Sequence, residues 1–201
     1  VIGFSHLHLN GTGCSDTGDI LFMPYTGKAR TQPGTQQDPL SGYASYYSKD
    51  NERALPGYYE VLLKTHRTKV ELTASDRVAF HRYTFPKDVE KHVMINLKDA
   101  NGDDRPTDTY LEQINDTVIR GYRYSTGWSK KQQIYFSAVF SQPVHLTLYH
   151  DSVQVAGNRL QGLDVKGNVA VAPVVEELGV KVGISPVSME NAMDNIGQEI
   201  K

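Results

Sequence analysis

The sequence predicts an all-β fold, an antiparallel β-sandwich with a short C-terminal linker helix. Two observations favour this fold class. Several short segments alternate apolar and polar residues with a period of two, which is the pattern of a strand with one buried face. Turn sequences that contain glycine, asparagine or proline separate these segments, as is typical of sandwiches and unlike parallel α/β sheets.

Four segments carry the alternation most clearly. In each of them apolar side chains occupy every second position and are expected to face the core. These residues are Tyr59, Val61 and Leu63; Val70, Leu72 and Ala74; Val93, Ile95 and Leu97; and Ile134, Phe136, Ala138 and Phe140. The predicted turns are Pro56-Gly57, Asn101-Gly102, Gly157-Asn158 and Gly167-Asn168.

Residues 24–56 interrupt the alternation with several prolines and glycines. An ordered loop of this length is uncommon in a compact domain and is often functional. Three tyrosines in it, Tyr43, Tyr46 and Tyr47, have the chemistry to stack on sugar rings. They are equally suited to packing the loop against the sandwich, and the sequence leaves both interpretations open.

A helix is expected at the end of the chain. Ser188 is suited to the N-cap, and Glu190 complements the positive first turn. An apolar stripe at helical spacing follows, formed by Met189, Ala192, Met193, Ile196 and Ile200. We therefore divide the chain into a β-sandwich domain, residues 1–187, and a linker helix, residues 188–201, whose stripe suggests that a packing partner has been lost.

Composition narrows the function classes. The 201 residues carry a formal net charge of −2, which gives no basic field for nucleic acid or anionic lipid. No apolar run approaches the roughly 20 residues needed to span a bilayer. The single cysteine, Cys14, rules out an intrachain disulfide and a cysteine-based zinc cage. Twelve tyrosines against one tryptophan favour strands and a polar aromatic surface.

Four residues near the start of the chain could be drawn together as a metal site. His6 and His8 would face the same side of a strand, and Asp16 and Asp19 follow closely. Their spacing matches no recognisable metal-binding pattern. Histidines that are hydrogen-bonded beside a tight loop are therefore the favoured interpretation.

No pair of carboxylates stands out as the general acid and base of a glycoside hydrolase. His81 and Arg82 lie in a strand with apolar side chains on both faces, so we expect a buried pair with satisfied polar atoms. The residues alone lead to a β-sandwich with a glycine-rich polar loop and no visible reaction centre.

Residues 3–24 read GFSHLHLNGTGCSDTGDILFMP, which closely resembles the GFSHTHLSGTGCxDxGDxxxMP signature of glycoside hydrolase family 92. Further similarities keep the family's order along essentially the whole chain. They are Pro56-Gly57-Tyr58-Tyr59, the runs ELTA at residues 71–74 and FHRYTF at 80–85, and VKVGIS at 180–185 followed by VSMENA at 187–192.

The resemblance implies a fragment of an exo-acting, calcium-dependent, inverting α-mannosidase, truncated at both ends. The parent enzyme would act on mannosides of N-glycans or mannans, in the periplasm of a bacterium or after secretion. In the family an N-terminal β-sandwich packs on a C-terminal (α/α) barrel, and the active site lies between them. The catalytic acid, the base and the calcium ligands belong to the barrel, so the fragment alone is expected to be inactive.

A mannose-containing glycan and the chain's own barrel domain are the partners that the resemblance implies. The surface that would meet the barrel is expected to promote self-association when it is bare. The expected sugar-contacting residues, in a loop of small residues that lets backbone groups approach a ligand closely, are His8, Gly11, Thr12, Gly13, Cys14 and Asp16.

Two alternatives stay open. The loop can be a structural turn that packs on the barrel without touching sugar. The chain can also be a stand-alone carbohydrate-binding or adhesion module, which would need an intact exposed sugar platform.

Overall fold

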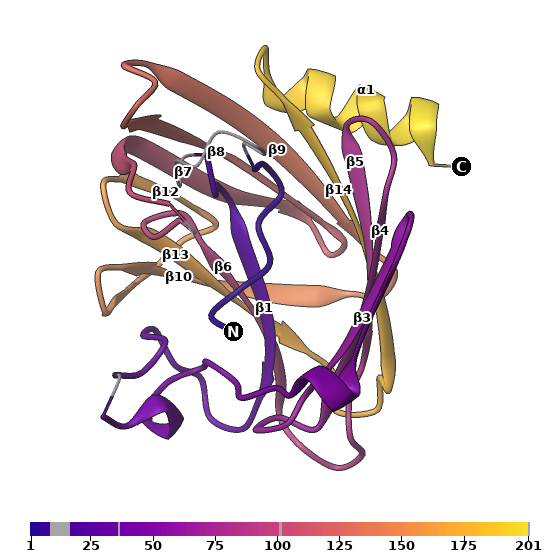
Figure 1. Cartoon of the computed structure of the whole chain (residues 1–201). Helices are drawn as coiled ribbons and strands as arrows, with labels where there is room; N and C mark the ends of the chain where they lie inside the picture. Colours follow the sequence, from indigo (N-terminus) through magenta and orange to yellow (C-terminus); the bar gives the residue numbers. More distant parts are fainter. Residues whose placement is uncertain (9–16, 36, 101, 201) are drawn as a thin grey trace.

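The computed structural model describes residues 1–8, 17–35, 37–100 and 102–200. As predicted, two antiparallel sheets pack face to face, and a helix lies on the outside of the larger one (Figure 1). The elements are β1 (Leu21–Thr26), η1 (Pro39–Ser41), η2 (Lys49–Asn51), β2 (Glu52–Leu55), β3 (Tyr58–Leu63), β4 (Thr68–Ala74), β5 (Val78–Thr84), β6 (Lys91–Asn96), β7 (Arg105–Asn115), β8 (Val118–Thr126), β9 (Gln132–Phe140), β10 (Val144–His150), β11 (Val153–Val155), β12 (Arg159–Gly162), β13 (Val165–Val171), β14 (Glu177–Ser185) and α1 (Met189–Glu199).

The smaller sheet has the strand order β1-β6-β13-β10-β11, and the larger has the order β12-β7-β8-β9-β14-β5-β4-β3-β2. Their inner faces share one apolar core. Phe22 of β1 meets Phe136 of β9 between the layers, with ring centroids 6.0 Å apart. The inward-facing residues predicted for β9, from Ile134 to Phe140, are all buried, so that alternation is confirmed.

Strand β6 departs from the expected alternation because both of its faces are buried. The loop between β1 and β2 contributes to this burial. Asn96 of β6 donates a hydrogen bond from Nδ2 to the Tyr43 hydroxyl at 2.9 Å. Tyr43 therefore packs the loop onto the sandwich, whereas Tyr46 and Tyr47 remain 52% and 45% exposed.

The loop itself is shorter than predicted. Pro24 lies inside β1, and the loop ends where β2 begins at Glu52, so it runs over residues 27–51. Proline fits in β1 because this strand pairs with β6 on one side only, which leaves its other edge free of a continuous ladder.

The turn predicted at Gly167-Asn168 is wrong, because both residues lie inside β13. A Cβ at position 167 would stand 2.4 Å from Leu111 Cδ2 and 2.7 Å from Leu146 Cδ1, so glycine lets these core side chains approach the backbone. The turns at Pro56-Gly57 and Gly157-Asn158 are confirmed. Asn101 lies outside the described residues.

Helix α1 is confirmed at the predicted place, with the Ser188 hydroxyl accepting a hydrogen bond from the Asn191 N–H at 3.0 Å. Its apolar stripe is not bare. Ala192 and Ile196 are buried where the helix packs on β14 and β9. Met189, Met193 and Ile200 stay half-buried, so the larger sheet covers part of the stripe, and the loss of a further partner stays a prediction.

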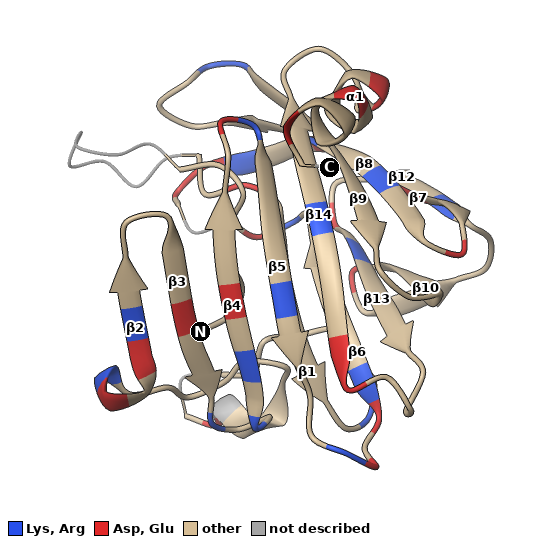
Figure 2. Ribbon diagram, turned by 90° about the vertical axis from the view of Figure 1, so that its right-hand side faces the viewer, with Lys and Arg blue, Asp and Glu red and all other residues tan. Residues whose placement is uncertain are grey.

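Charged side chains of both signs are interspersed over the larger sheet, as Figure 2 shows. Lys69 contacts both Glu60 and Glu71, at 2.9 and 3.4 Å. This mixed pattern agrees with the absence of a strong basic field in the composition. None of the described helices is long and apolar enough to cross a membrane.

Candidate functional site

The segment that carries the family-like signature leaves the sandwich after His6 and returns at Asp19 and Ile20. We call this point of closure the neck. The His6 N–H donates to the Asp19 carbonyl at 3.1 Å, and His6 Nδ1 lies 2.7 Å from the Ile20 carbonyl oxygen. These two contacts close a loop over residues 7–18, which we call the signature loop. Its residues 9–16 lie outside the described residues, so the geometry of the site is that of the neck and its surroundings.

A chain of side-chain hydrogen bonds fixes His6 to the larger sheet. His6 Nε2 lies 3.1 Å from His81 Nε2, and His81 Nδ1 lies 2.6 Å from the Tyr83 hydroxyl. The hydrogen-bond partners determine which ring nitrogen of each histidine carries the proton. Because a carbonyl only accepts, His6 Nδ1 carries a proton for Ile20, and in the neutral ring its Nε2 accepts from His81 Nε2–H. His81 Nδ1 then accepts from Tyr83, so every polar atom is satisfied.

Burial lowers the pKa of His6 to about 4 and the pKa of His81 well below its ordinary value. Both rings are therefore neutral near pH 7 and act as fixed donors and acceptors. The prediction of a buried His81–Arg82 pair is wrong. Successive side chains leave a strand on opposite faces, so Arg82 lies outside and donates two hydrogen bonds, at 2.6 and 2.8 Å, to Glu71.

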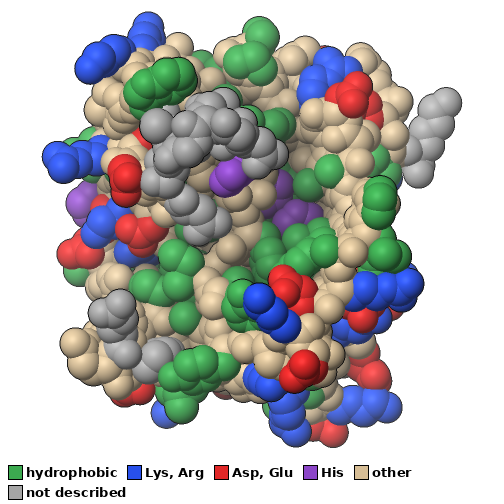
Figure 3. Space-filling model, viewed as in Figure 1, with side chains coloured by type: hydrophobic (Ala, Val, Ile, Leu, Met, Phe, Trp, Pro, Cys, Tyr) green, Lys and Arg blue, Asp and Glu red, His purple; other side chains and the backbone are tan. Residues whose placement is uncertain are grey.

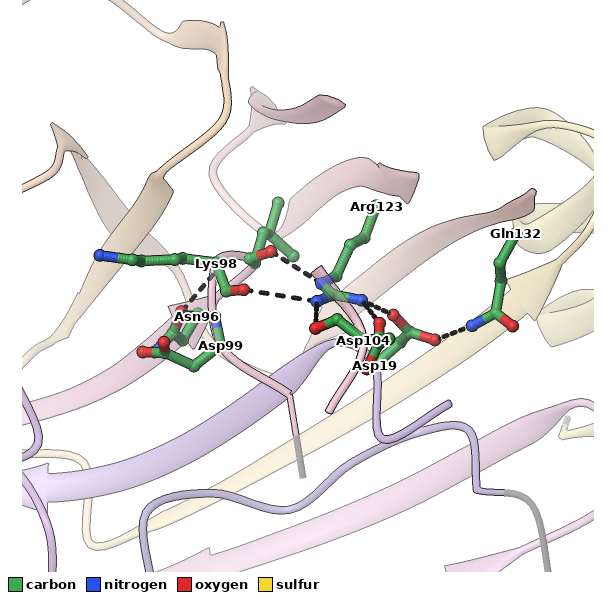
Figure 4. A network of polar contacts seen from close by, with 8 residues as sticks. Asp19, Asn96, Lys98, Asp99, Asp104, Arg123 and Gln132 are labelled. Atoms are coloured by element: carbon green, nitrogen blue, oxygen red, sulfur yellow. Dashed lines mark hydrogen bonds and ion pairs between the residues drawn. The ribbon is translucent and has the colours of Figure 1, made fainter. Parts of the chain in front are cut away.

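A second network holds the other side of the neck (Figure 4). Arg123 of β8 donates from Nη1 to the carboxylates of Asp19 and Asp104, and from Nε to the Leu97 carbonyl at 2.9 Å. Gln132, the first residue of β9, donates to the second oxygen of Asp19. The Arg123 and Asp19 side chains are fully buried.

The charges of this network do not balance. One guanidinium serves two buried carboxylates, and Asp104 Oδ1 has no hydrogen-bond partner. Burial raises the pKa of Asp19 to about 6, the Asp104 carboxylate adds to the rise, and Arg123 opposes it. The network is therefore a rigid anchor for the neck that carries an excess negative charge.

A hollow of about 380 Å³ opens beside the N-terminal segment. Phe4 and Tyr59 form aromatic walls with ring centroids 6.5 Å apart, and His81 also lines the hollow. Figure 3 shows the recess with hydrophobic and histidine side chains inside it. Aromatic walls with a few polar groups are the chemistry that a sugar ring requires.

Among the sugar-contacting residues predicted from sequence, His8 is described and is exposed two positions beyond the neck. Gly11, Thr12, Gly13, Cys14 and Asp16 lie outside the described residues, so their contact with sugar stays a prediction.

The idea of a metal site at the start of the chain gains nothing from the structure. Residues 5–8 form no strand, so His6 and His8 do not share a strand face as expected. His6 is bonded to Ile20 and His81, and Asp19 to Arg123. Within the described part of the chain, no three His, Cys, Asp or Glu side chains are placed to hold a metal ion.

Sequence reasoning missed Arg123, Asp104 and Gln132. One signal was available. The buried positions of β8 alternate through Ile119, Gly121, Arg123 and Ser125, so a charged residue stands where an apolar one is expected. A charge in the buried phase of a strand indicates an ion pair with a distant partner. Nothing in the sequence identified Asp19 as that partner.

Comparison with known proteins identifies the family. Residues 1–185 match the model of the glycosyl hydrolase family 92 N-terminal domain. The chain belongs to glycosyl hydrolase family 92. The curated proteins include no significant match to it.

Solved structures of GH92 enzymes share the fold. A family GH92 α-mannosidase from Bacteroides thetaiotaomicron, solved with mannoimidazole, is 34% identical with a TM-score of 0.92, over 98% of this chain and 27% of that one. The GH92 glycosyl hydrolase ccman5 is 25% identical with a TM-score of 0.82, over 99% of this chain and 28% of that one. An inverting GH92 mannosidase from B. thetaiotaomicron VPI-5482, 20% identical over 99% of this chain and 26% of that one, shows the fold alone, with a TM-score of 0.81. This GH92 chain thus spans about a quarter of the length of these relatives.

Proposed function

We propose that this GH92 chain is the non-catalytic sandwich of an exo-acting α-mannosidase and that its signature loop helps to form the mannose pocket. The observation that carries the proposal is the doubly anchored neck. Two networks, one through the half-buried His6 and one through the fully buried Asp19, hold both ends of a loop rich in small and polar residues. Such anchoring is what a loop needs in order to present backbone groups to a ligand in one geometry. The 34% identical relative is an α-mannosidase with mannoimidazole bound.

The chemistry itself would come from residues outside this chain. Inversion requires an acid and a base carboxyl roughly 6.5–9.5 Å apart with a water between them. The carboxylates of Asp19 and Asp104 next to the neck are unsuited to either role, because both are buried and share Arg123. We therefore assign the acid, the base and the calcium ligands to a C-terminal barrel of the longer enzyme.

The same proposal specifies the substrate of the complete enzyme and its cellular location. A mannoside of an N-glycan or a mannan is the substrate of the complete enzyme, in the periplasm or outside the cell. Among the described residues no three His, Cys, Asp or Glu side chains are placed to hold a metal ion, which agrees with calcium ligands elsewhere in the complete enzyme.

A stand-alone carbohydrate-binding module is the second candidate. The packing of α1 favours it, since β14 and β9 already bury Ala192 and Ile196 of the apolar stripe. The hollow lined by Phe4 and Tyr59 would be the sugar platform of such a module.

Domain exchange separates the two candidates. The sandwich of the 34% identical B. thetaiotaomicron α-mannosidase is replaced by this chain, and hydrolysis of an aryl α-mannoside is measured for the chimera and for the chain alone. The mannosidase proposal predicts turnover by the chimera and none by the chain. A folded but inactive chimera would favour the stand-alone module, and turnover by the chain alone would contradict both.

A further inference from the structure

Trp128 stands at the tip of the hairpin between β8 and β9. It is the only tryptophan of the chain and is 71% exposed. The Gly127 N–H donates to the Ser129 carbonyl at 2.9 Å, which closes a tight tip, and the exposed Lys130 and Lys131 follow. The hairpin thus presents a large flat indole with two ammonium groups nearby.

This hairpin is fixed to the neck of the signature loop. Its base closes with Ser125 opposite Gln132, and Gln132 reaches across to the carboxylate of Asp19 (Figure 4). Arg123, two residues before Ser125, binds the same carboxylate. The indole is therefore carried by a buried network that also anchors the signature loop, and only a few residues separate the two.

We propose that Trp128 is a sugar-stacking residue for the leaving-group side of the mannoside. The inference rests on the proposed function, in which the signature loop holds the terminal mannose. The rest of an exo-enzyme's substrate must leave that pocket past a neighbouring surface. An exposed indole packs against the apolar face of a pyranose, and the two lysines donate hydrogen bonds to hydroxyl groups. The ligand is an uncharged oligosaccharide with at least two sugars.

The single tryptophan supplies its own test. Fluorescence of this chain is recorded while mannotriose is added, with glycerol at a matched refractive index as the control. We expect a saturable blue shift, because the sugar displaces water from the indole. Trp128→Ala should weaken mannotriose binding by about tenfold in calorimetry, as for loss of an aromatic stacking contact.

Exposed Lys28, in the loop after β1, provides a matched control, Lys28→Ala, which should bind as the native chain does. An emission spectrum that ignores mannotriose would overturn the inference and leave Trp128 as a contact for another protein domain.

The fluorescence test of Trp128 and the activity of the chimera can fail separately. A chimera that hydrolyses mannosides while Trp128 ignores mannotriose rejects the stacking role and retains the mannosidase proposal. A chimera that is inactive while Trp128 responds rejects the mannosidase proposal and retains the sugar-binding surface. In an active chimera, Trp128→Ala should raise KM for mannobiose but leave KM for α-mannosyl fluoride unchanged, since the fluoride has no leaving-group sugar.

Discussion

His6 Nε2 and His81 Nε2 lie 3.1 Å apart, and this contact ties the half-buried segment before β1 to the larger sheet. The two rings are nearly parallel, with 4° between their planes. Because the Ile20 carbonyl fixes a proton on His6 Nδ1, a further proton on His6 Nε2 would displace the hydrogen bond that this nitrogen accepts from His81 Nε2–H. The pair therefore works as a neutral clamp at the neck of the signature loop.

Removing one ring should loosen the neck. In His6→Ala the His81 Nε2–H is left buried without a partner, which costs about 1–3 kcal/mol of unfolding free energy in urea titrations. Hydrogen exchange at the residue-6 amide, which donates to Asp19, should accelerate. Tyr83→Phe is the matched control, because it removes one hydroxyl and leaves the neck contacts in place. Unchanged exchange at residue 6 would contradict the clamp.

The clamp also predicts a pH dependence. The pKa of His6 is about 4 in the folded protein against 6.5 for a free ring, so the unfolded chain binds the proton first. The stability that His6 contributes is therefore lost as pH falls from about 6.5 towards 4. Asp19 changes stability with pH in the opposite direction. Its pKa of about 6 makes the folded state bind the proton first, so its protonation favours folding as pH falls. Urea titrations of the native chain and of His6→Gln hold Asp19 constant, and the gap between them should shrink by about 1–3 kcal/mol between pH 7 and pH 4.5. A constant gap would argue against a neutral His6.

Arg123 should be the most costly polar side chain to lose. Arg123→Met leaves two buried carboxylates without their cation, so we expect a loss of about 3–5 kcal/mol in urea titrations. Adding Asp19→Asn and Asp104→Asn should restore most of it. The exposed Lys87–Glu176 pair is the control, and Lys87→Ala should change stability by less than about 1 kcal/mol. Equal effects at both sites would show that burial of the network does not matter.

Two glycines should respond in opposite directions to the same substitution. Gly167→Ala places a methyl group against Leu111 and Leu146 and should destabilise the fold by about 1–3 kcal/mol. Gly197→Ala meets no atom within 4 Å and lies in α1, where alanine should stabilise by about 0.5–1 kcal/mol. Thermal melts of the two variants give the comparison. The same sign of change in both would contradict the core packing at β13.

Much of the fold could be predicted from sequence because strands with one buried face, such as β9, have an apolar residue at every second position. The prediction failed where burial depended on distant elements. Tyr43 covers strand β6 on its outer side. Gly167 is a core glycine of β13 rather than a turn residue, since Leu111 and Leu146 leave no room for a Cβ there, and neither fact is a local property of the sequence. The helix was placed correctly, but its stripe could not reveal that β14 covers it.

The candidate site was harder to predict from sequence than the fold. The signature identified the loop, but its two anchors join residues that lie 75 and 104 positions apart, His6 with His81 and Asp19 with Arg123. Hydrogen bonding between such partners follows from the register of β5, β8 and β1, which sequence reasoning did not assign. Trp128 was visible as a single tryptophan, and the contacts of Gln132 and Arg123 with Asp19 connect its hairpin to the neck.

The central claim is that the signature loop contacts the sugar, and kcat/KM of the domain-exchange chimera tests it most directly. Thr12→Ala and Asp16→Ala remove polar groups from the loop and keep the anchoring residues His6, His81, Asp19 and Arg123 in the sequence. For an aryl α-mannoside we predict that each lowers kcat/KM by at least about tenfold, since each tenfold equals about 1.4 kcal/mol of lost transition-state stabilisation. The melting temperature should stay unchanged. A chimera whose kcat/KM stays within about twofold for both variants would show that the loop is a structural turn, and the account of this domain as a wall of the mannose pocket would be contradicted.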